Sequence, residues 1–257
     1  MESTHGSGNA PRATLGGGEY AKIGGVAWND LMNILALDTS GEYCSAALWL
    51  DAEIDECCVH AGQRHSDLLL GMIDDLLLRH AMRLRDLDGI AYGAGPGTFT
   101  GLRIACGVTQ GLALGAGLPV AGVGTLLAMA QAARQTRVVC CIDARIHEVY
   151  HAAYEKIDDT WREVHAPSVC APGLAPALPG AGWHACGNGF SVYGDALLAR
   201  YDAHLSSVDG LMYPRARDIA GLAERVFRDG GGEDAALAAP LYIRDKVALK
   251  TSERGGQ

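Results

Sequence analysis

One order of strands, glycines and helices occurs twice in this chain, at a spacing of roughly a hundred residues. A short apolar run ends in Asp38 and is followed by a turn and a second strand, and the run that ends in Asp143 continues in the same way. Further along each copy, a strand leads into a Gly-x-Gly turn that opens a helix. A repeat of this length predicts two similar lobes, each built around its own sheet.

A duplicated β-β-β-α-β-α unit is the plan of the actin-like, ribonuclease-H-like proteins, which include sugar kinases and ATPases. We therefore predict an α/β chain of two lobes, each with a mixed sheet flanked by helices. The first lobe is expected over residues 32–136, the second over 137–247, and a flexible tail over 248–257. Residues 1–31 are rich in Gly, Ala and Ser without apolar periodicity, so we expect a disordered extension, with Met32 as a possible true start.

Apolar periodicity and turn residues predict the individual elements. The expected strands are Ile34–Leu37, Tyr43–Leu50, Glu53–His60, Leu87–Tyr92, Pro119–Val123, Val138–Asp143 and Glu148–Tyr154. The expected helices are Ser66–His80 with Ser66 as its cap, Thr100–Ala116, Thr125–Arg134 with Thr125 as its cap, Phe190–Arg200 and Arg215–Phe227.

The glycine-rich turn between Tyr92 and the following helix is the most distinctive motif. Gly95, Gly97 and Gly101 are spaced as G-x-G-x-x-x-G, one residue longer than the dinucleotide-binding fingerprint. A strand, a glycine turn and a helix N-terminus together can bind an anion. The same glycines can equally serve close packing of the backbone. The spacing alone leaves both interpretations open.

Two aspartates at strand ends are the candidate metal or base carboxylates, although Asp also favours such turns for purely local reasons. Active members of this fold usually carry Asp-x-Gly in the first hairpin, because a phosphate must approach the backbone closely. Here the turns read Asp-Thr-Ser and Asp-Ala-Arg, and the third side chain would crowd a phosphate. We therefore predict a degenerate nucleotide site formed by Asp38, Thr39, Ser40, Asp143, Gly187, Asn188 and Gly189.

Composition restricts the functions that are possible. The formal net charge is −9 and there is no basic stripe, which argues against strong direct binding of nucleic acid. None of the eight cysteines forms a C-x-x-C, and we expect reduced thiols in a cytoplasmic protein. The uncharged stretch 104–133 is interrupted by Pro119 and several glycines, so we interpret it as helix, strand and helix rather than a membrane span.

The segment His147-Glu148-Val149-Tyr150-His151 is a literal H-E-x-x-H, the zinc-peptidase motif. That motif binds zinc only on a helix, where the two histidines share one face. This segment alternates like a strand, on which the histidines would stand about 13 Å apart. One zinc ion needs both nitrogens at about 2 Å, so we expect no metal here.

The helix expected at Thr100–Ala116 carries Gly107, Gly111 and Gly115 at four-residue spacing. Each glycine should cost about 1 kcal/mol relative to alanine. Three on one face suggest that another helix packs very closely there. Arg103 lies in the first turn, where a cation opposes the helix dipole, so it has either a specific partner or simply a solvated side chain.

Four parts of the chain resemble the TsaB family of bacterial tRNA threonylcarbamoyladenosine biosynthesis proteins. They are Met32–Ser40, Tyr92–Ile104, Ile142–Arg145 with Glu148–Tyr150, and Pro240–Arg244. The resemblance runs from Met32 to about Val247, and the glycine stretch is its most specific part.

The resemblance implies a non-catalytic subunit without a cofactor, catalytic residue or metal of its own. It implies a heterodimer with TsaD, a paralogous subunit that carries the metal site and transfers threonylcarbamoyl to the adenosine beside the tRNA anticodon. The ATPase TsaE joins the assembly, so ATP and metal are expected on the partners. Contact with tRNA is expected to be indirect, and no membrane is involved. A homodimer is an open alternative when TsaD is absent.

In this family the contact with TsaD is helix to helix, through the two helices of the first lobe, which agrees with the glycine stripe. The predicted interface residues are Leu69, Leu70, Ile73, Leu77, Arg103, Gly107, Gly111 and Gly115. Two other functions stay open at this point. One is an active ATPase or kinase of the same fold, and the other is a zinc peptidase that uses His147, Glu148 and His151.

Overall fold

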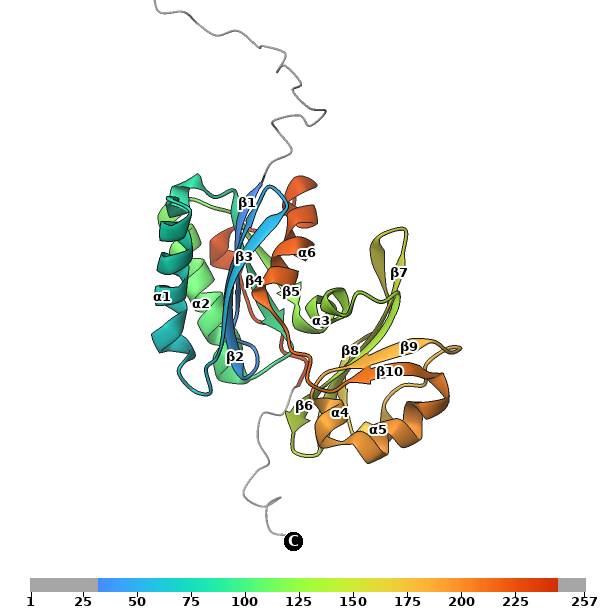
Figure 1. Ribbon diagram of the computed structural model, residues 1–257. Coiled ribbons are helices and arrows are strands. Elements are labelled where there is room, and N and C mark those ends of the chain that lie inside the picture. The colour runs from blue at the N-terminus through green and yellow to red at the C-terminus, as the bar shows by residue number, and fades with distance from the viewer. Residues whose placement is uncertain (1–31, 245–257) are drawn as a thin grey trace, which may run out of the picture. The chain divides into compact units, whose positions relative to one another are not determined.

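The computed structural model describes residues 32–244, and Figure 1 shows their arrangement. The predictions for residues 1–31 and for the tail 248–257 lie outside this range. The first sheet has the strand order β3-β2-β1-β4-β5. Its strands are β1 (Asn33–Asp38), β2 (Tyr43–Leu50), β3 (Glu53–His60), β4 (Gly89–Gly95) and β5 (Val120–Gly124). Strands β1, β2 and β3 pair antiparallel, whereas β4 pairs parallel with both β1 and β5.

The second sheet repeats this topology. Its order is β10-β9-β6-β7-β8, and reading it from β8 to β10 gives the first order with every strand replaced by its counterpart in the repeat. The strands are β6 (Arg137–Arg145), β7 (Glu148–Ile157), β8 (Thr160–Cys170), β9 (Trp183–Cys186) and β10 (Leu205–Asp209). The predicted α/β fold, with two mixed sheets flanked by helices, is confirmed.

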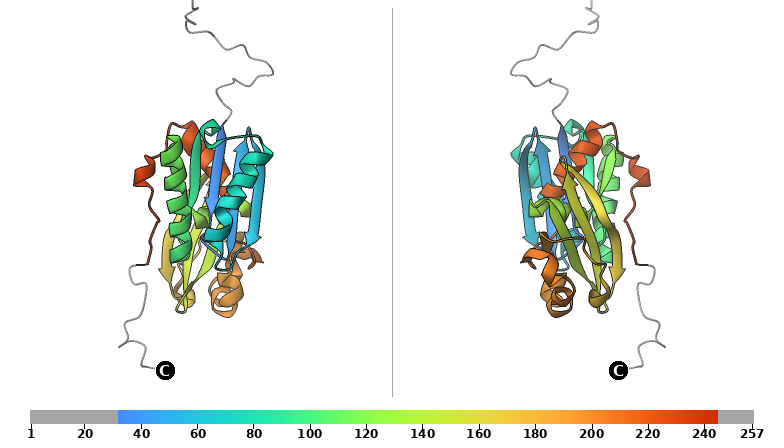
Figure 2. Two further views of the ribbon diagram at one scale, coloured as in Figure 1. Left: turned by 90° about the vertical axis from the view of Figure 1, so that its left-hand side faces the viewer. Right: turned by 90° about the vertical axis from the view of Figure 1, so that its right-hand side faces the viewer.

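Helices cover both faces of the first sheet, which explains why β1 is apolar at every position from Ile34 to Leu37. Side chains alternate between the faces of a strand. Leu35 and Leu37 therefore pack against α1 (His65–Arg79) and α2 (Phe99–Ala116), which lie on one face. Ile34 and Ala36 pack on the opposite face, against α6 (Ala216–Arg228). Figure 2 shows α1 and α2 running along the same side of the sheet.

Helix α3 (Thr125–Ala133) lies between the two sheets. Ala128 packs with the first sheet, while Leu126 and Met129 pack with the second. The other face of the second sheet is covered by α4 (Gly189–Val192) and α5 (Gly194–Tyr201). Short 3-10 turns complete the described chain: η2 (Leu84–Asp86), η3 (Pro172–Leu174), η4 (Asp202–His204) and η5 (Ala235–Leu237).

The prediction of a second lobe over residues 137–247 needs a correction. Helix α6 lies within that range, yet Ile219, Ala223 and Phe227 are buried against the first sheet. Its N-terminus is held there by Glu56 of β3, whose Oε1 accepts the N–H of Arg217 at 3.2 Å and whose Oε2 pairs with Arg215. A carboxylate at a helix N-terminus is stabilised by the helix dipole.

Other sequence predictions need smaller corrections. The expected helix 190–200 is divided into α4 and α5, and strands β8 and β10 were not predicted. Ser66 lies inside α1 rather than at its cap, which is Arg64, and Thr125 is the first residue of α3 after the cap Gly124. None of the helices in residues 32–244 has the length and apolar character needed to span a membrane.

Candidate functional site

The turn after β1 is buried and internally hydrogen-bonded. Asp38, Thr39 and Ser40 are each at most 3% exposed. Asp38 Oδ1 accepts the Ser40 N–H at 3.1 Å and the Ser40 hydroxyl at 2.9 Å. The Thr39 hydroxyl donates to the carbonyl of Gly101 at 2.6 Å. All three residues therefore serve the packing of the turn against the start of α2.

The glycine loop between β4 and α2 lies directly against this turn. A Cβ on Gly93 would lie 2.0 Å from Asp38 Oδ2, and one on Gly101 would lie 1.8 Å from the Thr39 carbonyl oxygen. A Cβ on Gly97 would lie 2.6 Å from the Ser40 carbonyl oxygen. No side chain fits at such distances, so these glycines are required by contacts within the chain. Protein atoms fill the inner side of the turn.

Asp38 occupies an unfavourable position for a charge. Its Oδ2 is buried and has no hydrogen-bond partner. Burial raises the pKa of this carboxyl from 3.8 to about 6, and the hydrogen bonds from Ser40 only partly oppose the rise. Nothing about this carboxylate suggests a ligand for a metal–phosphate pair, which would require access from the cleft.

The corresponding turn in the second lobe is more open. Asp143 Oδ1 accepts the N–H of Arg145 at 2.8 Å and the hydroxyl of Tyr193 at 3.0 Å. Its own N–H donates to Asn188 Oδ1 at 2.9 Å. Gly187, at φ +105°, and Gly189 pack against the carbonyl of Cys141, where a Cβ would lie 2.3 and 2.8 Å away respectively.

A cleft of about 640 Å³ separates the two turns. Of the predicted nucleotide-site residues, only Ser40, Asp143 and Asn188 line it, while Asp38, Thr39, Gly187 and Gly189 do not. Much of its wall is aromatic, formed by Tyr43, Phe99, Tyr150, Tyr213 and Tyr242. The rings of Tyr43 and Tyr213 stack with their centroids 3.6 Å apart. This aromatic wall could not be found from sequence patterns, because its members come from five separate segments.

The H-E-x-x-H segment does not form a metal site. His147 lies in the hairpin turn before β7, at φ +57°, and Glu148 is the first residue of that strand. His151 is fully buried, with Nε2 3.0 Å from the Tyr201 hydroxyl. Burial, and secondarily His165, lowers the pKa of His151 to about 4. Across residues 32–244 no group of three or more His, Cys, Asp or Glu side chains is placed to hold a metal ion. The zinc-peptidase alternative is therefore rejected.

The exposed face of α2 is made of small residues. Gly107, Gly111 and Gly115 are exposed, and a Cβ on any of them would have no atom within 4 Å. The helix that the sequence analysis expected to pack closely there is not another part of residues 32–244. These glycines leave a shallow, open surface on the helix.

Most of the α1 residues predicted for the partner interface are buried in the core of the first lobe. Leu69, Ile73 and Leu77 belong to the core between α1 and the first sheet. The apolar face of α1 packs against the first sheet, so that face is not free for a partner. Leu70 is 51% exposed, and Leu78, which was not predicted, is 82% exposed.

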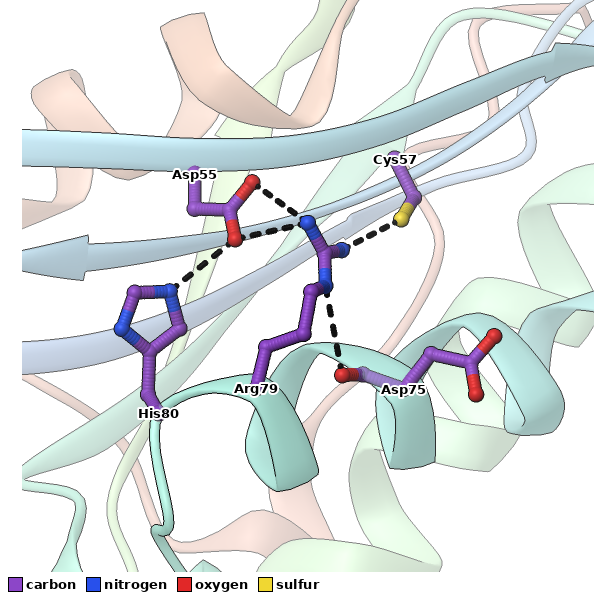
Figure 3. A network of polar contacts seen from close by, with 5 residues as sticks. All are labelled: Asp55, Cys57, Asp75, Arg79 and His80. Atoms are coloured by element: carbon purple, nitrogen blue, oxygen red, sulfur yellow. Dashed lines mark hydrogen bonds and ion pairs between the residues drawn. The ribbon is translucent and has the colours of Figure 1, made fainter.

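A polar network fixes the end of α1 to β3 (Figure 3). The Arg79 guanidinium donates to Asp55 Oδ1 at 2.9 Å and to Cys57 Sγ at 2.8 Å, and its Nε donates to the carbonyl of Asp75 at 3.3 Å. His80 Nε2 lies 2.9 Å from the other Asp55 oxygen. The exposed leucines of α1 are thus presented on a helix that is held in position.

Arg103, on the same face of α2 as the glycines, has a partner within the chain. Its guanidinium lies over the ring of Phe99, 3.7 Å from the centroid, and its Nε donates to the Tyr242 hydroxyl at 2.9 Å. The partner that its position in the helix suggested is, within the described residues, this aromatic pair.

Comparison with known proteins agrees with this geometry. A family model described as "TsaD: tRNA N6-adenosine threonylcarbamoyltransferase" matches residues 59–250. The tRNA threonylcarbamoyladenosine biosynthesis protein TsaB of Escherichia coli is 37% identical over 85% of this chain and 97% of its own length. The chain belongs to the TsaB family. The Haemophilus influenzae TsaB is 35% identical over 85% of this chain and 96% of its own length.

Solved structures support the same assignment for this TsaB-family chain. YeaZ from Pseudomonas aeruginosa is 36% identical, with a TM-score of 0.77 over 82% of this chain and 100% of that chain. A second Pseudomonas aeruginosa structure, of a protein with similarity to peptidase YeaZ, gives 35% identity and the same TM-score over 83% of this chain and 100% of that chain. The family resemblance found in the sequence is confirmed.

Proposed function

We propose that this TsaB-family chain acts in tRNA threonylcarbamoyladenosine biosynthesis as a non-catalytic subunit. The observation that carries the proposal is the filled turn after β1, where Gly93, Gly97 and Gly101 pack so closely against residues 38–40 that a Cβ on any of them would lie between 1.8 and 2.6 Å from a protein atom. Asp38 is enclosed beneath them and does not line the cleft. In this proposal a TsaD-type subunit performs the transfer, ATP and metal belong to TsaD and the ATPase TsaE, and tRNA is contacted indirectly in the cytoplasm.

The proposed docking face consists of the exposed glycines of α2 and the exposed leucines beside them. Gly107 and Gly111 allow a partner helix to approach the α2 backbone more closely than the usual 8–10 Å between helix axes. Leu70 and Leu78 on α1, and Leu114 on α2, are at least half exposed and would be covered by such a helix. The same face could pair two copies of this chain when the partner is absent.

An active ATPase or kinase remains the second candidate, but the structure offers it little support. Among the predicted nucleotide residues, the first-lobe aspartate is enclosed and the second-lobe aspartate is engaged by Tyr193 and Arg145. A calorimetric titration with Mg-ATP distinguishes the two functions. We expect no binding to the isolated chain, and a stoichiometric binding heat that disappears in Asp143→Asn would favour the ATPase.

The main test is reconstituted threonylcarbamoyl transfer to tRNA by TsaD and TsaE, with and without this chain. We expect transfer only when the chain is present, and none from the chain alone. Gly111→Leu should abolish the stimulation by filling the docking face. Ala196→Leu, which adds an exposed leucine to α5 of the other lobe, is the matched control and should behave as the unaltered chain. Full transfer by TsaD and TsaE without the chain would overturn the proposal.

A further inference from the structure

The last described residues follow a path from the first lobe to the second. After α6 the chain joins the free edge of the first sheet, where Val120 and Glu233 exchange backbone hydrogen bonds of 3.0 and 2.8 Å. The Tyr92 hydroxyl then donates to the carbonyl of Ala239 at 3.2 Å and accepts its N–H at 3.0 Å. The Gln110 amide donates to the carbonyl of Ala238 at 3.1 Å. This part of the segment is bound firmly to β4 and α2.

A second set of contacts holds the segment at the N-terminus of α2. The N–H of Leu241 donates to the carbonyl of Ala94 at 2.7 Å. Gly95 leaves room for this approach, since a Cβ there would lie 2.8 Å from the Leu241 carbonyl oxygen. Tyr242 then accepts the hydrogen bond from Arg103, and its ring centroid lies 5.6 Å from that of Phe99. We call these contacts the α2 anchor.

Two residues later the chain contacts the second lobe. The Arg244 guanidinium pairs with Glu148, the first residue of β7, and donates to the carbonyl of Arg145 at 3.4 Å. It also lies 6.0 Å from the ring centroid of Tyr150. The Arg244 side chain is only 13% exposed, so this ion pair is screened less by solvent than a surface pair. We call these contacts the hairpin anchor, after the β6–β7 hairpin.

We propose that residues 240–244 form a strap that couples the exposed face of α2 to the β6–β7 hairpin across the cleft. Two residues of extended chain reach about 7 Å, so the Cα atoms of Tyr242 and Arg244 can separate by no more than that, and only the lengths of their side chains add to the span between the two anchors. Leu241, Tyr242 and Arg244 also line the cleft. The strap therefore limits the width of the cleft at this side, and because a single residue separates Tyr242 from Arg244, loss of one anchor frees the chain next to the other.

The coupling has a consequence for partner binding, and that consequence rests on the proposed function. Arg103 lies one helical turn before Gly107 on the exposed face of α2, and Tyr242 is 47% exposed beside it. A helix docked on the glycines would contact this anchor and so bias the position of the hairpin. The docking face and the cleft would then be linked through the side chains of Arg103, Tyr242 and Arg244.

Amide hydrogen exchange of the isolated full-length chain tests the coupling. Glu148→Gln removes the charge of the hairpin anchor without changing its size. We expect exchange at the Leu241 amide, which belongs to the other anchor, to become about tenfold faster, because local opening of the strap exposes that hydrogen bond. Glu163→Gln, at an exposed glutamate on β8 that lies opposite Tyr154 and so away from Glu148, is the matched control and should leave Leu241 unchanged. Equal Leu241 exchange in the two variants would overturn the proposal.

The reverse experiment checks the coupling in the other direction. Tyr242→Ala removes the aromatic contact and the hydrogen bond at the α2 anchor, and exchange in the hairpin amides 146–149 should then accelerate. Unchanged hairpin exchange would show that the two anchors are independent. Since neither measurement involves TsaD or tRNA, failure of the strap leaves the proposed function intact, and failure of the transfer assay leaves the strap intact.

Discussion

Asp38→Asn should change the pH dependence of stability in a way that follows from the burial of this carboxyl. The pKa is raised from 3.8 to about 6 in the folded protein, so the folded state holds the proton more tightly than the unfolded state. The stability associated with the protonated acid is fully present below pH 3.8 and is lost as the pH rises through 6. Each tenfold difference in proton affinity corresponds to about 1.4 kcal/mol, which gives about 3 kcal/mol of lost stability at pH 7.

Asparagine fits the site but cannot ionise. Its Oδ1 can accept the two hydrogen bonds that Ser40 donates to Asp38 Oδ1. Its amide group takes the place of the unpartnered Oδ2, where an unsatisfied N–H₂ costs about 1–3 kcal/mol. That cost is nearly independent of pH. The difference in unfolding free energy between variant and wild type should therefore move by about 2 kcal/mol in favour of the variant between pH 4 and pH 7, because part of the total has already been lost at pH 4.

The assay is urea unfolding of wild type and variant at several pH values from 4 to 7.5, compared as differences. The comparison is necessary because His151 has its pKa lowered to about 4 in the folded protein, so the protein loses stability through this histidine as the pH falls from 6.5. This effect is opposite in sign to that of Asp38 and cancels when the two proteins are compared. Asp74→Asn, at an exposed position of α1, is the control for loss of one negative charge. Stabilities of wild type and Asp38→Asn that change in parallel over this pH range would refute the reasoning.

Three further predictions concern packing and docking. Gly101→Ala should lower the free energy of unfolding by about 3 kcal/mol or prevent folding, because the new Cβ would lie 1.8 Å from the Thr39 carbonyl oxygen. Gly107→Ala, in the same helix but with no atom near the new Cβ, should raise the free energy of unfolding by about 1 kcal/mol, and urea unfolding measures both changes. Gly111→Leu should raise the stability of the isolated chain by up to about 1 kcal/mol and yet abolish its co-elution with TsaD on gel filtration; an intact complex would contradict the docking face. Glu56→Ala should cost about 3 kcal/mol in urea unfolding, since it leaves a partly buried arginine unpaired at the start of α6, and a loss below about 1 kcal/mol would mean that solvent replaces the pair.

Four of the five strands of the first lobe could be predicted to within one residue at each end, while the predicted bounds of β4 were off by two and three residues, and the reason for the agreement is physical. A strand buried on both faces must be apolar throughout, and β1 and β2 show this in sequence before a turn ends each of them. The duplication was equally visible, because each copy must rebuild the same sheet from the same order of elements. Edge strands β8 and β10 are half exposed, so their apolar pattern is weak and they were missed.

Which leucines of α1 are left exposed could not be predicted from periodicity. An apolar stripe shows that a helix has a buried face, but it does not say what covers that face. For Leu69 and Ile73 the answer is the sheet of the same lobe. The assignment of α6 failed for a related reason, since its apolar stripe fits either sheet, and contacts between its N-terminus and residues far away in the sequence, such as Glu56, help to fix it to the first. Short-range sequence patterns do not show which element covers the apolar face of α1, nor which sheet α6 packs against.

The glycines between residues 93 and 115 belong to two groups with different roles, although they form one continuous series in the sequence. Gly93, Gly97 and Gly101 are demanded by protein atoms less than 3 Å from where a side chain would begin. Gly107, Gly111 and Gly115 continue the series along α2 with nothing within 4 Å, so each weakens the helix by about 1 kcal/mol without an offsetting contact in the described chain. The first group closes the turn after β1, and the second leaves open a helix face that no other part of residues 32–244 covers. A closed site beside an open surface is what a subunit that acts through a partner requires.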